Sequence, residues 1–142
     1  MSNLATTGNM PQILAAEEAL KGLPQVEFDL EHYVIPGVYC RVLHIPAGVA
    51  LTGKIHLKEH ISILAAGELL VADADKNVRI KAPKVMVDRP GIKRLGYAVT
   101  DCTFINVLAT DKTEIEEIEK ESVVNSFDEY DAHQKLLTKE GG

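Results

Sequence analysis

The feature that most constrains the fold is a series of short apolar runs between Val26 and Ala109. Turn signals separate these runs of Val, Ile, Leu, Tyr and Phe, among them PG at 36–37, PAG at 46–48 and RPG at 89–91. The spacing between turns is about 8–12 residues, which is typical of short strands. The middle of the chain therefore predicts an all-β sandwich or barrel.

Three strands of this region can be predicted individually. The run VYCRVLHI at 38–45 alternates between two faces, with Tyr39, Arg41, Leu43 and Ile45 on one of them. The run ISILAAGELLVAD predicts two strands broken by a tight turn at Gly67, and TFINVLAT at 103–110 predicts a strongly apolar strand.

Helices are expected at both ends of the chain. Asn9 is placed to cap a short helix with Pro11 in its first turn, and Asp111 with Glu114 forms the pattern of a capping box. Beyond these, Phe127 to Leu137 indicates a weak helix. We expect three parts: a polar arm and helix at 1–25, a β-barrel at 26–110, and a helix with an acidic tail at 111–142.

Composition excludes several function classes. The chain of 142 residues is long enough for one domain, and its net charge of -6 disfavours binding to nucleic acid. No apolar run reaches the ~18 residues of a membrane span, and MSNLATTGNM lacks the features of a signal peptide. Cys40 and Cys102 lie outside any CxxC pair, so we expect two reduced thiols.

The most informative stretch is PAGVALTGKIHLKEHISILAAGELLV at 46–71. Lys54 and His56 are two residues apart, so on a strand they face the same side. His60 follows four residues later, just before the next apolar run. One hairpin can therefore gather these three side chains on one wall of a barrel.

The spacing of this stretch resembles the first motif of the cupin superfamily, G-x5-H-x-H-x3-E-x6-G. Gly48, Lys54, His56, His60 and Gly67 occupy its five fixed positions, with Lys in the slot of the first His and His in the slot of the Glu. The second cupin motif is matched less well. If the count starts at Gly91, Arg94 takes the place of its last His and Ala98 the place of its Asn.

A narrower resemblance covers residues 23–124. The runs GKIHLKEH, RPGIKRLGYA and ATDKTEIEEIE are similar to those of small cupin-like proteins encoded by bacteriophages. This resemblance implies a single jelly-roll cupin barrel with a short N-terminal and a short C-terminal helix. It also implies a viral origin, in the host cytoplasm or the virion.

The residues in the cupin slots favour an anionic ligand over a metal ion. Lys54 and Arg94 have no lone pair to give, which leaves only His56 and His60 as candidate metal ligands. We therefore expect no cofactor, with a divalent metal as the less favoured alternative. The predicted binding set for a small phosphate- or carboxylate-bearing molecule is Lys54, His56, His60, Lys93, Arg94 and Tyr97.

Two other functions stay open at this point. The chain can be a virion component, such as a capsid decoration or tail-associated jelly-roll protein, in which the basic cluster forms ion pairs with Glu59, Asp88 or Asp101. It can also be a cupin enzyme of the isomerase, epimerase or dioxygenase type, with His56 as a base in the metal-free case. We expect a non-enzymatic protein that forms a homo-oligomer, a dimer first of all, because exposed strand edges need covering.

Overall fold

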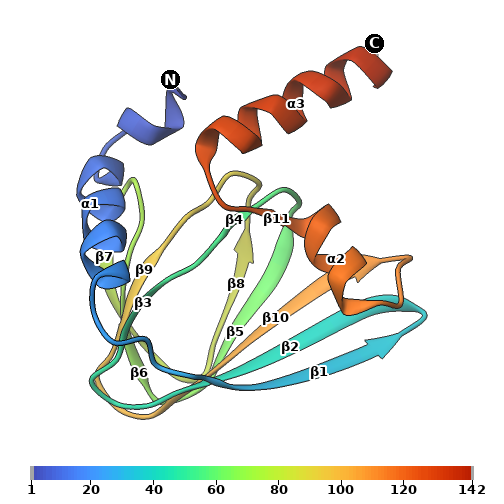
Figure 1. Ribbon diagram of the computed structural model, residues 1–142. Helices are drawn as coiled ribbons and strands as arrows, with labels where there is room; N and C mark the ends of the chain where they lie inside the picture. The colour runs from blue at the N-terminus through green and yellow to red at the C-terminus, as the bar shows by residue number, and fades with distance from the viewer. Residues whose placement is uncertain (1, 142) are drawn as a thin grey trace.

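A computed structural model describes residues 2–141 of the chain and the side chains of residues 2–137. Its centre is a pair of antiparallel sheets that face each other (Figure 1). The larger sheet has the order β1-β2-β10-β5-β8, formed by Asp29–Ile35, Gly37–Ile45, Cys102–Thr110, His60–Ala66 and Lys84–Asp88. The smaller sheet has the order β3-β9-β6-β7, formed by Ala50–Thr52, Leu95–Ala98, Glu68–Ala72 and Asn77–Lys81.

The two sheets enclose an apolar core because alternate residues of each strand point inward. Leu64 of β5 is fully buried and packs with Leu69 and Val71 of β6 across the space between the sheets. Ile45 and Cys102, at the adjoining ends of β2 and β10, belong to the same cluster. The expectation of a β-rich jelly roll is thus confirmed, as are the two strands on either side of Gly67.

The expectation of a closed barrel needs correction. Among the described residues the sheets share no strand ladder, so each keeps free edges. The segment that runs from β3 of the smaller sheet to β5 of the larger sheet begins after Thr52 and forms only the two-residue strand β4, Ile55–His56. This strand pairs with β11, Val123–Val124, from the C-terminal part instead of bridging the two sheets.

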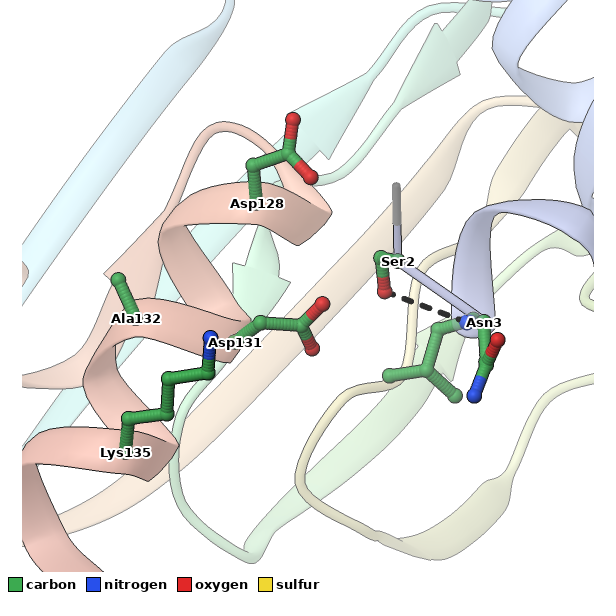
Figure 2. A pocket seen from close by; sticks show the side chains of 7 residues that line it. Ser2, Asn3, Asp128, Asp131, Ala132 and Lys135 are labelled. Atoms are coloured by element: carbon green, nitrogen blue, oxygen red, sulfur yellow. Dashed lines mark hydrogen bonds between the residues drawn. The ribbon is translucent and has the colours of Figure 1, made fainter.

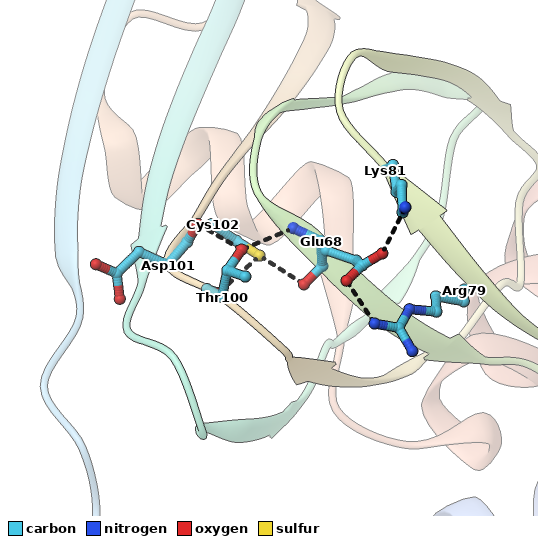
Figure 3. Close-up of polar contacts among 6 residues, drawn as sticks. All are labelled: Glu68, Arg79, Lys81, Thr100, Asp101 and Cys102. Carbon is cyan, nitrogen blue, oxygen red and sulfur yellow. Dashed lines mark hydrogen bonds and ion pairs between the residues drawn. The ribbon is translucent and has the colours of Figure 1, made fainter.

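A tight turn at Gly67 connects β5 of the larger sheet with β6 of the smaller sheet, beside the polar contacts of Glu68, Thr100 and Cys102 that Figure 3 shows. Gly67 has φ +89°, and an added Cβ would lie 2.2 Å from the carbonyl oxygen of Asp101, so only glycine fits there. The Cys102 thiol donates to the carbonyl of Glu68 at 3.2 Å, and the Glu68 carboxylate binds Arg79 at 2.6 Å. These contacts hold the turn in one geometry.

Three α-helices and a short 3₁₀ helix, Leu4–Thr6, flank the sheets: α1, Met10–Lys21; α2, Ile115–Ser122; and α3, Phe127–Gly141. Ile13 of α1 and Phe127 of α3 are buried in one apolar cluster, and Ile118 anchors α2 beside Tyr39 of β2. Figure 1 shows α1 beside the smaller sheet and α2 near the end of the larger one. None of the described helices combines the length and apolar character that a membrane span requires.

Both predicted side-chain caps are wrong. Asn9 occupies the N-cap of α1 but donates its amide to the carbonyl of Asp73 at 3.2 Å, which ties the helix to the β6–β7 turn. Asp111 does not begin a helix, since α2 starts at Ile115. The Thr110 hydroxyl instead accepts the backbone N–H of Lys112 at 3.0 Å, in a short turn that precedes α2.

Candidate functional site

A cavity of about 320 Å³ lies between the two sheets. This volume is at the small end of the range typical of small-molecule sites. Much of the wall is apolar, with contributions from Phe28, Leu30, Leu43, Ile45, Leu51, Leu69, Val71, Met86, Ile92, Phe104 and Leu108. The polar side chains on the wall are Tyr39, Arg41, Thr52, Lys54, His56, His60, Ser62, Arg94, Asn106, Glu119 and Ser122.

A buried ion pair forms beside this cavity. Asp88, at the end of β8, is 1% exposed and accepts hydrogen bonds from both terminal nitrogens of Arg94, one of them at 2.7 Å. The Ser62 hydroxyl donates to the same carboxylate, and His60 Nε2 lies 3.1 Å from Asp88 Oδ2. The strand register brings His60 and Asp88 together, because the two residues are directly paired on the neighbouring strands β5 and β8. Each charge is thus compensated within the fold.

The two histidines of the predicted set lie face to face. The rings of His56 and His60 stack with centroids 3.9 Å apart. His60 Nδ1 lies 3.3 Å from the carbonyl of Lys58, so both of its ring nitrogens face protein groups. His56 Nδ1 is buried and has no hydrogen-bond partner. His60 Nε2 also has no well-aligned hydrogen bond, but it is directed at Asp88. His56 lines the cavity and its ring makes no hydrogen bond with a described residue, so it is the imidazole that remains for a ligand.

Burial and neighbouring charges set the protonation states here. Burial, reinforced by the charges of His60, Arg41 and Arg94, lowers the pKa of His56 to about 3, so its imidazole is neutral at pH 7. Burial alone would raise the pKa of Asp88. Hydrogen bonding from Arg94, His60 and Ser62 outweighs that effect and holds the pKa of this carboxyl far below its ordinary value.

Four of the six predicted binding residues meet at the cavity. Lys54, His56, His60 and Arg94 all line it, as the cupin spacing predicts. Lys93 does not, because its ammonium is buried elsewhere, 2.6 Å from the carboxylate of Glu17 on α1. Tyr97 is 44% exposed and lies outside the lining.

Sequence reasoning missed two cavity residues, Arg41 and Asn106, and placed Asp88 only among the ion-pair candidates. Of those candidates, Asp88 is the one that pairs with Arg94. A signal for Arg41 was present in the strand at 38–45. One of its two predicted faces consists of Tyr39, Arg41, Leu43 and Ile45, and all four line the cavity. A charged residue in an otherwise apolar inward row marks a polar site.

The side chains in the cupin metal slots do not fit a metal ion. Lys54 and Arg94 are cations without lone pairs, and the Asp88 carboxylate is already bound by Arg94 and Ser62. The ring nitrogens of His60 face Asp88 and the Lys58 carbonyl, which leaves His56 as the single imidazole that could coordinate a metal ion. Among the described residues, no group of three His, Cys, Asp or Glu side chains is arranged to hold a metal.

A second hollow lies between the N-terminal segment and α3 (Figure 2). Its lining includes Ser2, Asn3, Asp128, Asp131 and Lys135. The hollow is open to solvent, and its charged groups are surface side chains. We therefore assign the candidate site to the cavity between the sheets.

Solved structures confirm the fold. KdgF from Halomonas sp. is similar with a TM-score of 0.54 and 12% identity, over 68% of this chain and 91% of that one. A cupin superfamily protein from Desulfitobacterium hafniense has a TM-score of 0.52 and 8% identity, over 66% and 86%. Salicylate 1,2-dioxygenase from Pseudoaminobacter salicylatoxidans, solved with gentisate, has a TM-score of 0.52 and 14% identity, over 68% of this chain and 30% of that one.

The fold is thus a β-rich cupin jelly roll, which is the class that the first sequence motif indicated. These similarities are below 25% identity and define the fold alone. No protein-family model and no curated protein matches the sequence.

Proposed function

We propose that the protein binds a small anionic molecule in the cavity between the two sheets and does not convert it chemically. The observation that carries the proposal is the polar part of the cavity wall. There the cations Lys54 and Arg41 make no ion pair with a described residue, and a buried nitrogen of His56 has no partner. A cationic wall in a low-dielectric cavity favours an anionic guest.

The acid–base properties of the site favour binding over catalysis. A general base works best when its pKa is near the operating pH, whereas the pKa of His56 is about 3. His60 contacts a carboxylate, as a catalytic histidine often does, but both of its ring nitrogens are directed at protein groups. The metal-free isomerase or epimerase alternative is therefore the weaker proposal.

Isothermal titration with mono-, di- and cyclic nucleotides and with small carboxylates tests the proposal. We expect one ligand class to bind with a stoichiometry near one, and Lys54→Ala to weaken its binding. Lys76→Ala is the matched control, since this lysine sits in the β6–β7 turn, outside the cavity lining. Absence of heat with every ligand of the panel would remove the proposal.

The second candidate function is that of a virion component, and the proposal that the protein comes from a bacteriophage is part of this candidate. The outer face of the larger sheet favours this candidate, because Ile61 of β5 is paired with Val87 of β8 and both are exposed. The exposed fractions are 41% for Ile61, 66% for Val87 and 62% for the nearby Val85. Apolar side chains grouped on one face are typical of an interface with a neighbouring subunit. Mass spectrometry of purified particles and sedimentation of the isolated protein separate virion assembly from the homo-oligomer that we also expect.

A further inference from the structure

The polarity of the cavity wall changes along the strands of the larger sheet. One inward row consists of Arg41 on β2, Asn106 on β10 and Ser62 on β5, which are register partners. Two residues along each strand, the next inward row is Leu43, Phe104 and Leu64. The rows are about 7 Å apart. The row on the other side of the polar one contains Tyr39 and Leu108. The wall therefore changes from polar to apolar toward the end at Leu43 and Phe104, within the length of a small molecule.

The smaller sheet continues the apolar end. Leu43 and Phe104 pack against the core cluster that contains Leu69 and Val71 of β6. Leu51 of β3 joins the same cluster and lines the cavity. A guest that reaches this end is surrounded by hydrocarbon from both sheets, where an ionic group would lose its hydration without compensation.

Charge neutralisation distinguishes Arg41 from the other cations near the cavity. Arg94 is neutralised by Asp88, and Lys93 by Glu17. Lys54 is exposed at the cavity rim. Arg41 is half-buried, lines the cavity, and makes no hydrogen bond or ion pair with any described residue. It is thus the inward-facing cation that has no ion-pair partner among the described residues.

Asn106 supplies an independent indication of a ligand at the same place. Its side chain is directly opposite Arg41 on the neighbouring strand and is 5% exposed. It lines the cavity, yet its amide makes no hydrogen bond with a described residue. The amide therefore faces the cavity without a protein partner, and a ligand atom beside Arg41 would hydrogen-bond to it.

The geometry points to an amphipathic monocarboxylate as the ligand, with its carboxylate on Arg41 and Asn106 and its apolar body over Leu43 and Phe104. A guanidinium fork matches the two oxygens of a carboxylate. Glu119 of α2, which also lines the cavity, disfavours a second negative charge on the ligand. This inference rests on the proposed function and narrows it to one ligand class.

Titration calorimetry with hexanoate, octanoate and octan-1-ol tests the inference. We expect octanoate to bind about 15-fold tighter than hexanoate, since each buried methylene contributes roughly fourfold in affinity. Arg41→Gln should weaken octanoate binding at least tenfold and leave octan-1-ol within twofold. The matched control, Arg89→Gln, removes an exposed arginine outside the cavity lining and should leave both affinities unchanged.

The possible results separate this inference from the proposed function. If a nucleotide binds and the alkyl carboxylates do not, or if octanol binds as well as octanoate, the inference fails and the proposed function survives. If no anion binds at all, both fail. Nuclear Overhauser contacts from the terminal methyl of octanoate to Leu43 and Phe104 of the wild-type protein test the orientation without any variant. Contacts to Lys54 instead would reverse the orientation and overturn the inference.

Discussion

Replacing Asp88 by asparagine is the sharpest test of how the cavity wall is held together. The substitution keeps the shape of the side chain and removes the charge that neutralises Arg94. Because the Asp88 carboxylate is buried and the Arg94 side chain is only 22% exposed, the remaining guanidinium cannot regain full hydration. Removing one partner of a buried pair costs about 3–5 kcal/mol, and partial access of Arg94 to water places our expectation near 3 kcal/mol.

Urea unfolding of wild type, Asp88→Asn and Glu68→Gln measures this cost. Glu68 also binds an arginine, but Arg79 is 57% exposed, so the control should lose much less stability than Asp88→Asn. In a thermal scan, 3 kcal/mol corresponds to a drop in Tm of about 6–12 °C. Equal losses in the two variants would refute the claim that burial makes the Asp88 pair different.

The same pair predicts a pH dependence with a definite sign. The pKa of Asp88 is depressed in the folded state, so the unfolded chain takes up the proton first as the pH falls. The stability difference between wild type and Asp88→Asn should be fully present above about pH 5 and shrink below about pH 4, the range in which an ordinary aspartate titrates. A difference that stays constant down to pH 3 would show that packing, not charge, is responsible.

Three further predictions follow from the geometry. Gly67→Ala should cost more than about 2 kcal/mol in urea unfolding, because its Cβ would collide with the Asp101 carbonyl, whereas Gly53→Ala has open space and should be near neutral. His56 has a lowered pKa, so the unfolded state binds more protons between about pH 6.5 and 3. Acidification through this range should therefore destabilise wild type by up to about 1.4 kcal/mol per pH unit more than His56→Asn, as read from urea midpoints. Metal analysis of protein purified without chelator or nickel should find no stoichiometric iron, zinc or manganese; one equivalent would overturn the assessment of the donor set.

The sequence was sufficient for the β-rich jelly-roll class, though not for the open edges of its sheets, and for the meeting of Lys54, His56, His60 and Arg94. Short apolar runs with regular turns indicated a β-structure, and the motif spacing placed distant residues in one cavity. Both signals depend on strand alternation, which survives in a sequence even when residue identities change.

The assignment of Tyr97 to the site overlooked strand alternation, whereas the position of Lys93 could not be predicted from it. Arg94 precedes β9 and Tyr97 lies within it, an odd number of residues apart, so the two point to opposite faces of a regular strand. Gly96 lines the cavity, which places Tyr97 outside. Lys93 binds Glu17 of α1, a contact across 76 positions that no local pattern encodes.

The ion pair between Asp88 and Arg94 also affects how readily this site can evolve into a metal-binding site. Arg94→His alone would put an imidazole in the usual cupin slot but would leave the Asp88 carboxylate buried without its guanidinium. Asp88→Asn alone would instead leave the Arg94 guanidinium without its carboxylate partner. Either first step passes through a less stable protein, so the two changes are epistatic, and mutational drift between the two kinds of site is slow.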